Sequence, residues 1–214
     1  AIAISRIAHA MKAEGQSVIH MEFGQPSTGA PAPAIAEAHR ILDAEAGGYW
    51  ESPLLRARVA KLYKDRYGVV IDPERVIMTA GASPALVVAL NMRFAPGDRV
   101  AIARPGYVAY RNTLKALHME PVEIDCGPEV RFQLTAEALR ALDPAPAGVI
   151  IASPANPTGT IIPEAELKAI AEVCRERNIS VISDEIYHGL SYTGPTPSML
   201  QFEPNALIVN SFSK

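Results

Sequence analysis

The chain has 214 residues, of which 49% are hydrophobic and 20% charged, and its formal net charge is −3. This composition is typical of a folded protein with a sizeable core and excludes the disordered and collagen-like classes. The mild acidity disfavours nucleic acid or an anionic membrane as the main partner. No apolar stretch approaches the roughly 18–20 residues of a membrane-spanning helix.

Cysteine and histidine usage shows no recognisable metal-binding motif. The two cysteines, Cys126 and Cys174, share no ligand spacing with the five histidines, so no zinc site is expected. Either both cysteines are small buried hydrophobic residues, or Cys126 is an exposed thiol beside a Gly-Pro turn. The first 15 residues predict an amphipathic helix without the apolar core and cleavage site of a secretory signal. We therefore expect a cytoplasmic protein.

The N-terminal part of the chain predicts an arm between two structural units. Residues 24–33 are rich in glycine and proline, which favours an ordered loop. A helix is predicted over residues 35–46, and Gly47 and Gly48 follow it. These breaks divide the chain into residues 1–46 and residues 47–214.

From residue 76 onward, short apolar runs alternate with helical patterns. Strands are predicted over residues 76–79, 100–103, 121–124, 149–152, 180–183 and 207–210, and helices over residues 84–94, 107–117 and 163–177. Most of the strands are continuous apolar runs, which suit strands covered on both faces. The alternation predicts an α/β fold with a mostly parallel, doubly wound sheet.

The helix over residues 163–177 has the clearest pattern. Its apolar face is predicted to carry Leu167, Ile170, Ala171 and Cys174, at the spacing of one helical side. Pro163 suits the first turn, and Asn178 can end the helix in a left-handed conformation.

Chemically capable residues follow five of the predicted strands. In an open α/β sheet, ligands bind outside the carboxyl ends of the strands. In chain order, these ends supply Ala82 and Ser83, Tyr107, Asn156, Asp184 with Tyr187, and Ser211 with Lys214. Each residue also has an ordinary structural role open to it, such as a cap, a core ring, a turn, a salt bridge or a surface lysine. Their joint occurrence at one sheet edge predicts a ligand site.

Three of these positions indicate the chemistry. Ser83 as N-cap, with Pro84 at the first helical position, predicts a helix N-terminus that suits a phosphate. Asp184 ends a buried strand, where an ionised carboxylate requires a partner. Lys214 follows an apolar strand, and a desolvated lysine is the nucleophile that forms Schiff bases.

The segments around these residues resemble the class I/II aminotransferases of PLP (pyridoxal 5′-phosphate) fold type I, an aspartate-aminotransferase-like group. The most recognisable motifs are SPANPTGT at 153–160, SDEIY at 183–187 and NSFSK at 210–214. Further matches are GQP at 24–26, LRARVA at 55–60 and PGDRV with PGYVAY between 96 and 110. The likeness covers nearly the whole chain, and the form DEIYHGL is closest to a bacterial subgroup.

The resemblance implies a three-layer α/β/α large domain with a mostly parallel seven-stranded sheet. Residues 1–46 would be the N-terminal helix and arm, part of the small domain and the active-site entrance. Residues 47–214 would be the PLP-binding large domain, incomplete at its C-terminal end. We expect the chain to be part of a longer enzyme, because the family's further phosphate-binding arginine and its substrate-carboxylate arginine would follow Lys214.

The resemblance also implies catalytic and ring-binding roles. Lys214 would carry PLP as a Schiff base and shuttle a proton. Asp184 would pair with the pyridinium nitrogen. Asn156 and Tyr187 would hydrogen-bond the ring hydroxyl oxygen, and Tyr107 would stack on the ring.

Phosphate, substrate and subunit roles follow in the same way. The residues that would bind the phosphate are Ala82, Ser83 and Ser211. Tyr49 would reach the phosphate of a neighbouring subunit, which implies a homodimer with shared active sites. Gly24 and Asn156 would contact the substrate. The segment after Tyr49 is shorter than in the family, and Trp50 and His188 either line a substrate pocket or simply pack.

These roles predict a PLP-dependent aminotransferase (EC 2.6.1.-) of amino acid metabolism that acts on an amino acid and a 2-oxo acid. One alternative is a C–S β-lyase, or an aminocyclopropane-carboxylate-synthase-like enzyme, with the same site residues. A PLP-binding domain of a transcription regulator is disfavoured, because the residues before Gly24 are too few for a winged-helix region. A fourth alternative is that the 214 residues by themselves are half of an enzyme and have no catalytic activity.

Overall fold

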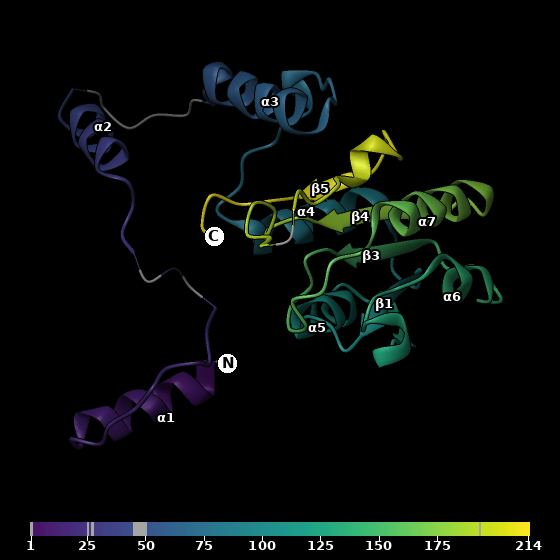
Figure 1. The fold of residues 1–214 in the computed structure, drawn as a ribbon, viewed down its shortest axis with the longest axis horizontal. Coiled ribbons are helices and arrows are strands. Elements are labelled where there is room, and N and C mark those ends of the chain that lie inside the picture. The colour runs from purple at the N-terminus through teal and green to yellow at the C-terminus, as the bar shows by residue number, and fades with distance from the viewer. Residues whose placement is uncertain (1, 25, 27, 45–50, 193) are drawn as a thin grey trace. The chain divides into compact units, whose positions relative to one another are not determined.

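The computed structural model describes residues 2–24, 26, 28–44, 51–192 and 194–214. The chain forms two compact units, Ala1–Tyr49 with Ser213–Lys214, and Trp50–Phe212. The first unit contains α1 (Ile2–Ala13) and α2 (Ala32–Ala44), which confirms both predicted N-terminal helices (Figure 1). The predicted domain boundary between residues 46 and 47 lies outside the described residues. Within the described ranges, every helix is too short or too polar to cross a membrane.

The second unit is a parallel sheet with helices on both faces. Its strands are β1 (Arg99–Arg104), β2 (Glu120–Asp125), β3 (Gly148–Ala152), β4 (Ser180–Asp184) and β5 (Leu207–Val209). They are ordered β2-β1-β3-β4-β5, and each neighbouring pair is parallel. The helices are α3 (Pro53–Tyr67), α4 (Ala82–Arg93), α5 (Val108–Ala116), α6 (Ala136–Arg140) and α7 (Glu164–Glu176), with short 3₁₀ helices at Pro73–Arg75, Pro128–Val130 and Met199–Gln201.

The three-layer α/β/α prediction is confirmed, because alternate strand residues enter two separate cores. Val100 and Ile102 pack with α4 and α5 on one face of the sheet. Ala101 lies between them and packs with α3, α6 and α7 on the other face. Successive strand side chains point to opposite faces, so continuous apolar runs of this kind build both cores at once.

The predicted number of strands is wrong. The sheet has five strands in the described part of the chain, not seven, and residues 76–79 do not form one. Val76 is extended (φ −92°, ψ 117°), but Ile77 is 58% exposed. A β-branched run becomes a strand only where a neighbouring strand pairs with its backbone groups, and sequence propensity does not supply that neighbour.

Helix α7 forms as its pattern predicts. The four predicted apolar side chains are all buried: Leu167, Ile170, Ala171 and Cys174. Asn178 has φ 56°, and the next amide, Ile179 N–H, donates to the carbonyl of Cys174 at 2.7 Å. Pro163 is the residue just before the helix rather than part of its first turn.

Both cysteines are buried, so the alternative of an exposed thiol at Cys126 is wrong. Burial raises the pKa of the Cys174 thiol to about 12 and also raises the pKa of Cys126. Thiols with raised pKa values are poor nucleophiles near neutral pH, because the thiolate is the reactive form. Neither cysteine is therefore a candidate for the chemistry.

Helix α3 was missed in the sequence, although it carries both of its end signals. Ser52 Oγ accepts a hydrogen bond from Leu55 N–H at 3.3 Å, and Pro53 occupies the first helical position. Gly68, with φ 71°, ends the helix in the left-handed region. A serine followed by proline at one end and glycine at the other is the usual signature of a bounded helix.

We expect Gly148→Ala to destabilise the second unit by about 1–3 kcal/mol through overpacking. A Cβ atom at Gly148 would lie 2.1 Å from Phe94 Cζ and 3.0 Å from the carbonyl oxygen of Ser180. Urea unfolding would measure the loss. Combination with Phe94→Leu should restore part of it, since the two residues share one space. Gly29→Ala is the control, because a Cβ there meets nothing within 4 Å; equal losses in both alanine variants would contradict the overpacking.

Candidate active site

The strand order places a topological switch point between β1 and β3. The chain passes from β1 to β2 on one side and returns to β3 on the other. A cavity lies at the carboxyl ends of these two strands, and its lining includes Ala103, Tyr107, Tyr110, Ala152 and Asn156. Crevices at such a position are the usual ligand sites of open α/β sheets.

Asp184 lies at the carboxyl end of β4 and is held by two hydrogen bonds. The hydroxyl of Tyr110 donates to Oδ2 at 2.5 Å, and the backbone N–H of Ile186 donates to Oδ1 at 3.1 Å. Burial raises the pKa of Asp184, and these two hydrogen bonds act against the rise. A buried carboxylate held by neutral donors attracts a cationic ligand group strongly.

Three further predicted residues lie at neighbouring strand ends. Tyr107 immediately precedes α5 and is 38% exposed. The ring centroid lies 5.4 Å from that of Tyr110, edge to face at 86°. Burial raises the pKa of Tyr187, while a side-chain hydrogen bond with Asn156 acts against the rise. The loops after β1, β3 and β4 thus bring an aromatic face, an amide and a phenol close to the Asp184 carboxylate.

The predicted phosphate loop forms a helix N-terminus, but with a different cap. Gly81, with φ 105°, is the N-cap of α4, so Ser83 is not the cap and Pro84 is the third helical residue. The positive φ of Gly81 lies in a region that favours glycine. Pro84 is tolerated in the first turn of α4, because the first amides of a helix have no acceptor within the helix. No side chain caps this end within the described residues, and Ser83 is exposed. Ala82 is half-buried beside it.

The last predicted residues lie near the end of the chain and in the arm. Ser211 is partly buried, and its N–H donates to Asn210 Oδ1 at 2.8 Å. In the first unit, Lys214 Nζ donates to the backbone carbonyl of Gly24 at 2.5 Å. Tyr49 and Trp50 lie outside the described residues.

A buried polar network beneath the loop after β4 was missed in the sequence. Glu185 is only 1% exposed, and its carboxylate accepts hydrogen bonds from Ser183 Oγ, Ser198 Oγ and Met199 N–H at 2.9–3.2 Å. Burial raises the pKa of Glu185 to about 7, against the effect of these hydrogen bonds. The acidic pair in SDEIY therefore contains one carboxylate at the ligand site and one inside the protein.

His188 joins this network and does not line the cavity. Its Nε2–H donates to the carbonyl of Ser153 at 2.9 Å, and the hydroxyl of Tyr67 lies 2.7 Å from Nδ1. Burial lowers the pKa of His188 to about 4, so near neutral pH Nδ1 carries a lone pair that accepts from Tyr67. The 3.4 Å approach of Nδ1 to Glu185 Oε2 is for this reason not an ion pair near neutral pH. His188 instead ties the loops after β3 and β4 together.

We expect Tyr110→Phe to lower the free energy of unfolding by about 1–2 kcal/mol, because Asp184 loses a hydrogen-bond donor. The pKa of Asp184 should rise further, since the Tyr110 hydroxyl holds it down. Urea unfolding would measure the first effect and NMR titration of the carboxyl carbon the second. Tyr192→Phe is the control, because Tyr192 is fully exposed. An Asp184 pKa that stays unchanged in Tyr110→Phe would contradict the assignment.

A parallel, doubly wound sheet with a buried acid, an aromatic face and an amide near its switch point is typical of α/β domains that bind small molecules. The family model for aminotransferase class I and II matches residues 17–214. Valine–pyruvate aminotransferase of Mycobacterium tuberculosis is 48% identical over 202 residues, which cover 92% of this chain and 52% of that protein.

Solved structures agree with this match. A crystal structure of an aminotransferase from Mycobacterium tuberculosis has a TM-score of 0.96 at 44% identity and covers 100% of this chain and 56% of its own. Aspartate aminotransferase from Thermus thermophilus with maleate has a TM-score of 0.93 at 28% identity, with 100% and 57% covered. The chain belongs to the class I and II aminotransferase family. It spans about half the length of these relatives.

Proposed function

We propose that the whole protein is a PLP-dependent aminotransferase (EC 2.6.1.-) that transfers an amino group between an amino acid and a 2-oxo acid. The observation that carries the proposal is the convergence of Tyr107, Asn156, Asp184 and Tyr187 at the switch point of the sheet. The name of the valine–pyruvate relative supports an amino acid and a 2-oxo acid as the substrate pair.

The described residues fit PLP by their chemistry. The buried Asp184 carboxylate suits a protonated ring nitrogen, and the exposed part of Tyr107 suits stacking on an aromatic ring. The N-terminus of α4, with Ala82 and Ser83 in its first turn and no side-chain cap in the described chain, suits a phosphate. We include Ser211 in the phosphate site as a hydroxyl donor. When bound, PLP supplies an electron sink for the substrate's carbanion character.

The chain's own residues would orient the reactants and move one proton. Asp184 would keep the ring nitrogen protonated, because the negative charge of its carboxylate would stabilise the positively charged form of the ring. Asn156 and Tyr187, already joined by a hydrogen bond, would hold the ring oxygen. Lys214 Nζ would bind the cofactor covalently and then carry a proton to and from the substrate Cα. Gly24 would contact the substrate carboxylate through its backbone.

The assembly and domain assignments belong to the same proposal. We assign residues 1–46 to the small domain and the active-site entrance, and residues 47–214 to the PLP-binding domain. Tyr49 would reach the phosphate in a second subunit, so the active form would be a homodimer. The two buried, unpaired cysteines are consistent with a reducing compartment and support a cytoplasmic enzyme.

An absorption spectrum of the full-length protein, before and after borohydride reduction, tests the proposal. We expect a visible band that reduction removes, and a pyridoxyl mass adduct on the peptide that contains Lys214. Amino-donor turnover measured with and without a 2-oxo acid would separate transamination from β-elimination, because only transamination requires the acceptor. Absence of the band and of the adduct after incubation with PLP would overturn the cofactor assignment.

A further inference from the structure

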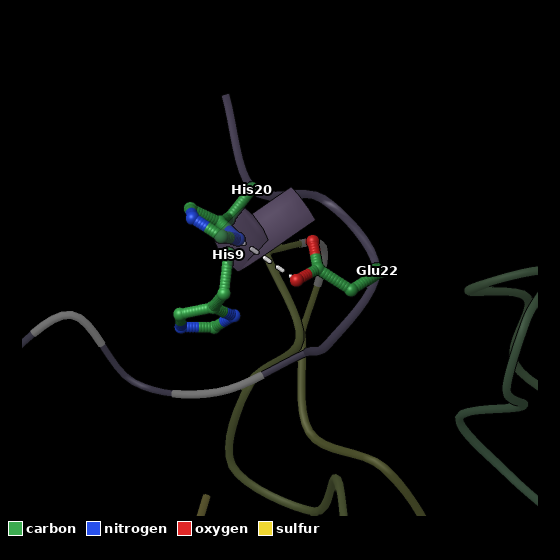
Figure 2. Close-up of side chains that lie close together, drawn as sticks. All are labelled: His9, His20 and Glu22. Atoms are coloured by element: carbon green, nitrogen blue, oxygen red, sulfur yellow. Dashed lines mark hydrogen bonds and ion pairs between the residues drawn. The ribbon is translucent and has the colours of Figure 1, made fainter. Parts of the chain in front are cut away.

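Two histidines and one glutamate gather in the first unit, apart from every residue assigned a role above. Figure 2 shows the side chains of His9, His20 and Glu22 turned toward a common space. One ligand atom from each lies within 4.8 Å of the others, and this is the one group of its kind among the described residues. His9 comes from α1, and the chain reverses after Gly15, which has φ 84°. The cluster therefore depends on a turn that glycine favours.

We propose that His9, His20 and Glu22 bind one divalent transition-metal ion of the Zn²⁺ type. Two imidazoles and a carboxylate are the ligand set that Zn²⁺, Co²⁺, Ni²⁺ and Cu²⁺ prefer over Mg²⁺ or Ca²⁺. Three protein ligands leave the fourth coordination position of a tetrahedral ion open for a water molecule, as in zinc sites with three protein ligands.

The geometry lies close to that of a bound state. Zn–N bonds are about 2.0–2.1 Å, so tetrahedral ligand atoms lie roughly 3.3 Å apart. The spacing of up to 4.8 Å must contract by up to about 1.5 Å to reach this tetrahedral distance, which side-chain rotation can achieve because both histidines are exposed. His20 Nδ1 is already 2.8 Å from Glu22 Oε1, and the two imidazole rings have centroids 4.9 Å apart.

Local hydrogen bonds prepare the ligands. His9 Nδ1 lies 2.8 Å from the carbonyl of Ser5, a contact of the kind that orients metal-binding imidazoles. The hydrogen bond between His20 Nδ1 and Glu22 Oε1 holds the second imidazole beside the carboxylate.

The bound ion would fix α1 to the start of the arm. Glu22 stands two residues before Gly24, whose carbonyl accepts the hydrogen bond from Lys214. A crosslink at Glu22 would restrict the segment that leads to this contact. Metal binding should therefore slow proteolytic cleavage between α1 and α2.

Zinc titration of the full-length, chelator-treated protein by isothermal titration calorimetry tests the site. We expect saturable binding of one Zn²⁺ per chain at neutral pH, with the affinity reduced at least about tenfold in His9→Ala and in His20→Ala. His39→Ala is the matched control, because His39 is exposed on α2 and outside the cluster. Wild type and variants are all titrated with the same PLP content, so that any zinc bound at other sites contributes equally to each titration.

Two further readouts keep the test decisive. Circular dichroism should show unchanged helix content in the variants, since these side chains lie on the surface. Zinc should protect the wild type from limited proteolysis between α1 and α2, but it should not protect His20→Ala. Affinity that is equal in wild type and His20→Ala, or absence of saturable binding, would overturn the site.

Discussion

Replacement of Lys214 by alanine is expected to abolish the pyridoxyl adduct and to lower turnover by a factor of about 10³ or more. Positioned proton transfer alone contributes about 10²–10⁴ to a rate, and loss of the covalent attachment adds to the effect. The magnitude is large because one atom, Lys214 Nζ, would serve as both the nucleophile and the proton carrier. Steady-state kcat and kcat/KM of the full-length enzyme, with peptide mass mapping, would measure both losses.

Lys214→Arg separates charge from chemistry in this prediction. Arginine keeps the positive charge and a donor that can reach the Gly24 carbonyl, but its guanidinium does not deprotonate in proteins. We therefore expect the arginine variant to fold and yet to show no adduct. Lys168→Ala, on the exposed face of α7, should leave adduct and turnover unchanged. Full activity in Lys214→Arg would contradict the assigned role.

The candidate site could be predicted from the sequence because its parts follow strands. Tyr107, Asn156 and Asp184 each stand at or just after an apolar run, and parallel strands bring their carboxyl ends to one edge. This rule needs only the strand positions, and all five strands of the sheet fall within a residue or two of their predicted places. The contacts between Asn156 and Tyr187 and around Asp184 then follow from the strand order.

The residues that sequence reasoning missed depend on contacts between distant segments. Tyr110 is hydrogen-bonded to Asp184, which lies 74 residues further along the chain, and Tyr67 is hydrogen-bonded to His188, which lies 121 residues further along. An apolar pattern predicts which face is buried, but it does not pair a polar side chain with its partner. PGYVAY did hold a signal, since its second tyrosine stands on the same side of α5 as the apolar Leu114.

The errors in local structure have related causes. Residues 76–79 have strand propensity but no pairing neighbour in the described chain, and a strand requires one. Ser83 is a favourable N-cap by type, yet Gly81 provides the backbone conformation at the start of α4. In both cases a local preference gave way to the geometry that surrounding segments impose.

The network beneath Asp184 should give opposite pH dependences of stability when its two titrating groups are removed one at a time. The pKa of Glu185 is raised from 4.5 to about 7, so its contribution to folding is complete below pH 4.5 and is lost as the pH rises to about 7. The pKa of His188 is lowered from 6.5 to about 4, so its contribution is complete above pH 6.5 and is lost as the pH falls to about 4. Each shift corresponds to about 3 kcal/mol.

In the wild type these two slopes largely cancel between pH 4.5 and pH 6.5. Glu185→Gln removes the acid and leaves the histidine, so the free energy of unfolding of this variant should rise by up to about 3 kcal/mol from pH 4 to pH 6.5. His188→Gln keeps a donor for the Ser153 carbonyl but does not titrate, so stability should fall by a similar amount from pH 4.5 to pH 7.

Urea unfolding of the full-length apoenzyme at half-unit pH steps would measure the two profiles. The variants are compared by how their free energy of unfolding changes with pH and not by its absolute value, because either substitution also removes a hydrogen-bonding group at every pH. Glu164→Gln is the control, since Glu164 is exposed at the start of α7. Profiles of the two variants that stay parallel to the wild type would show that Glu185 and His188 titrate at their ordinary pKa values. Opposite slopes would show that the loop carrying Asp184 rests on one buried acid and one buried neutral imidazole, each held away from its ordinary protonation by burial.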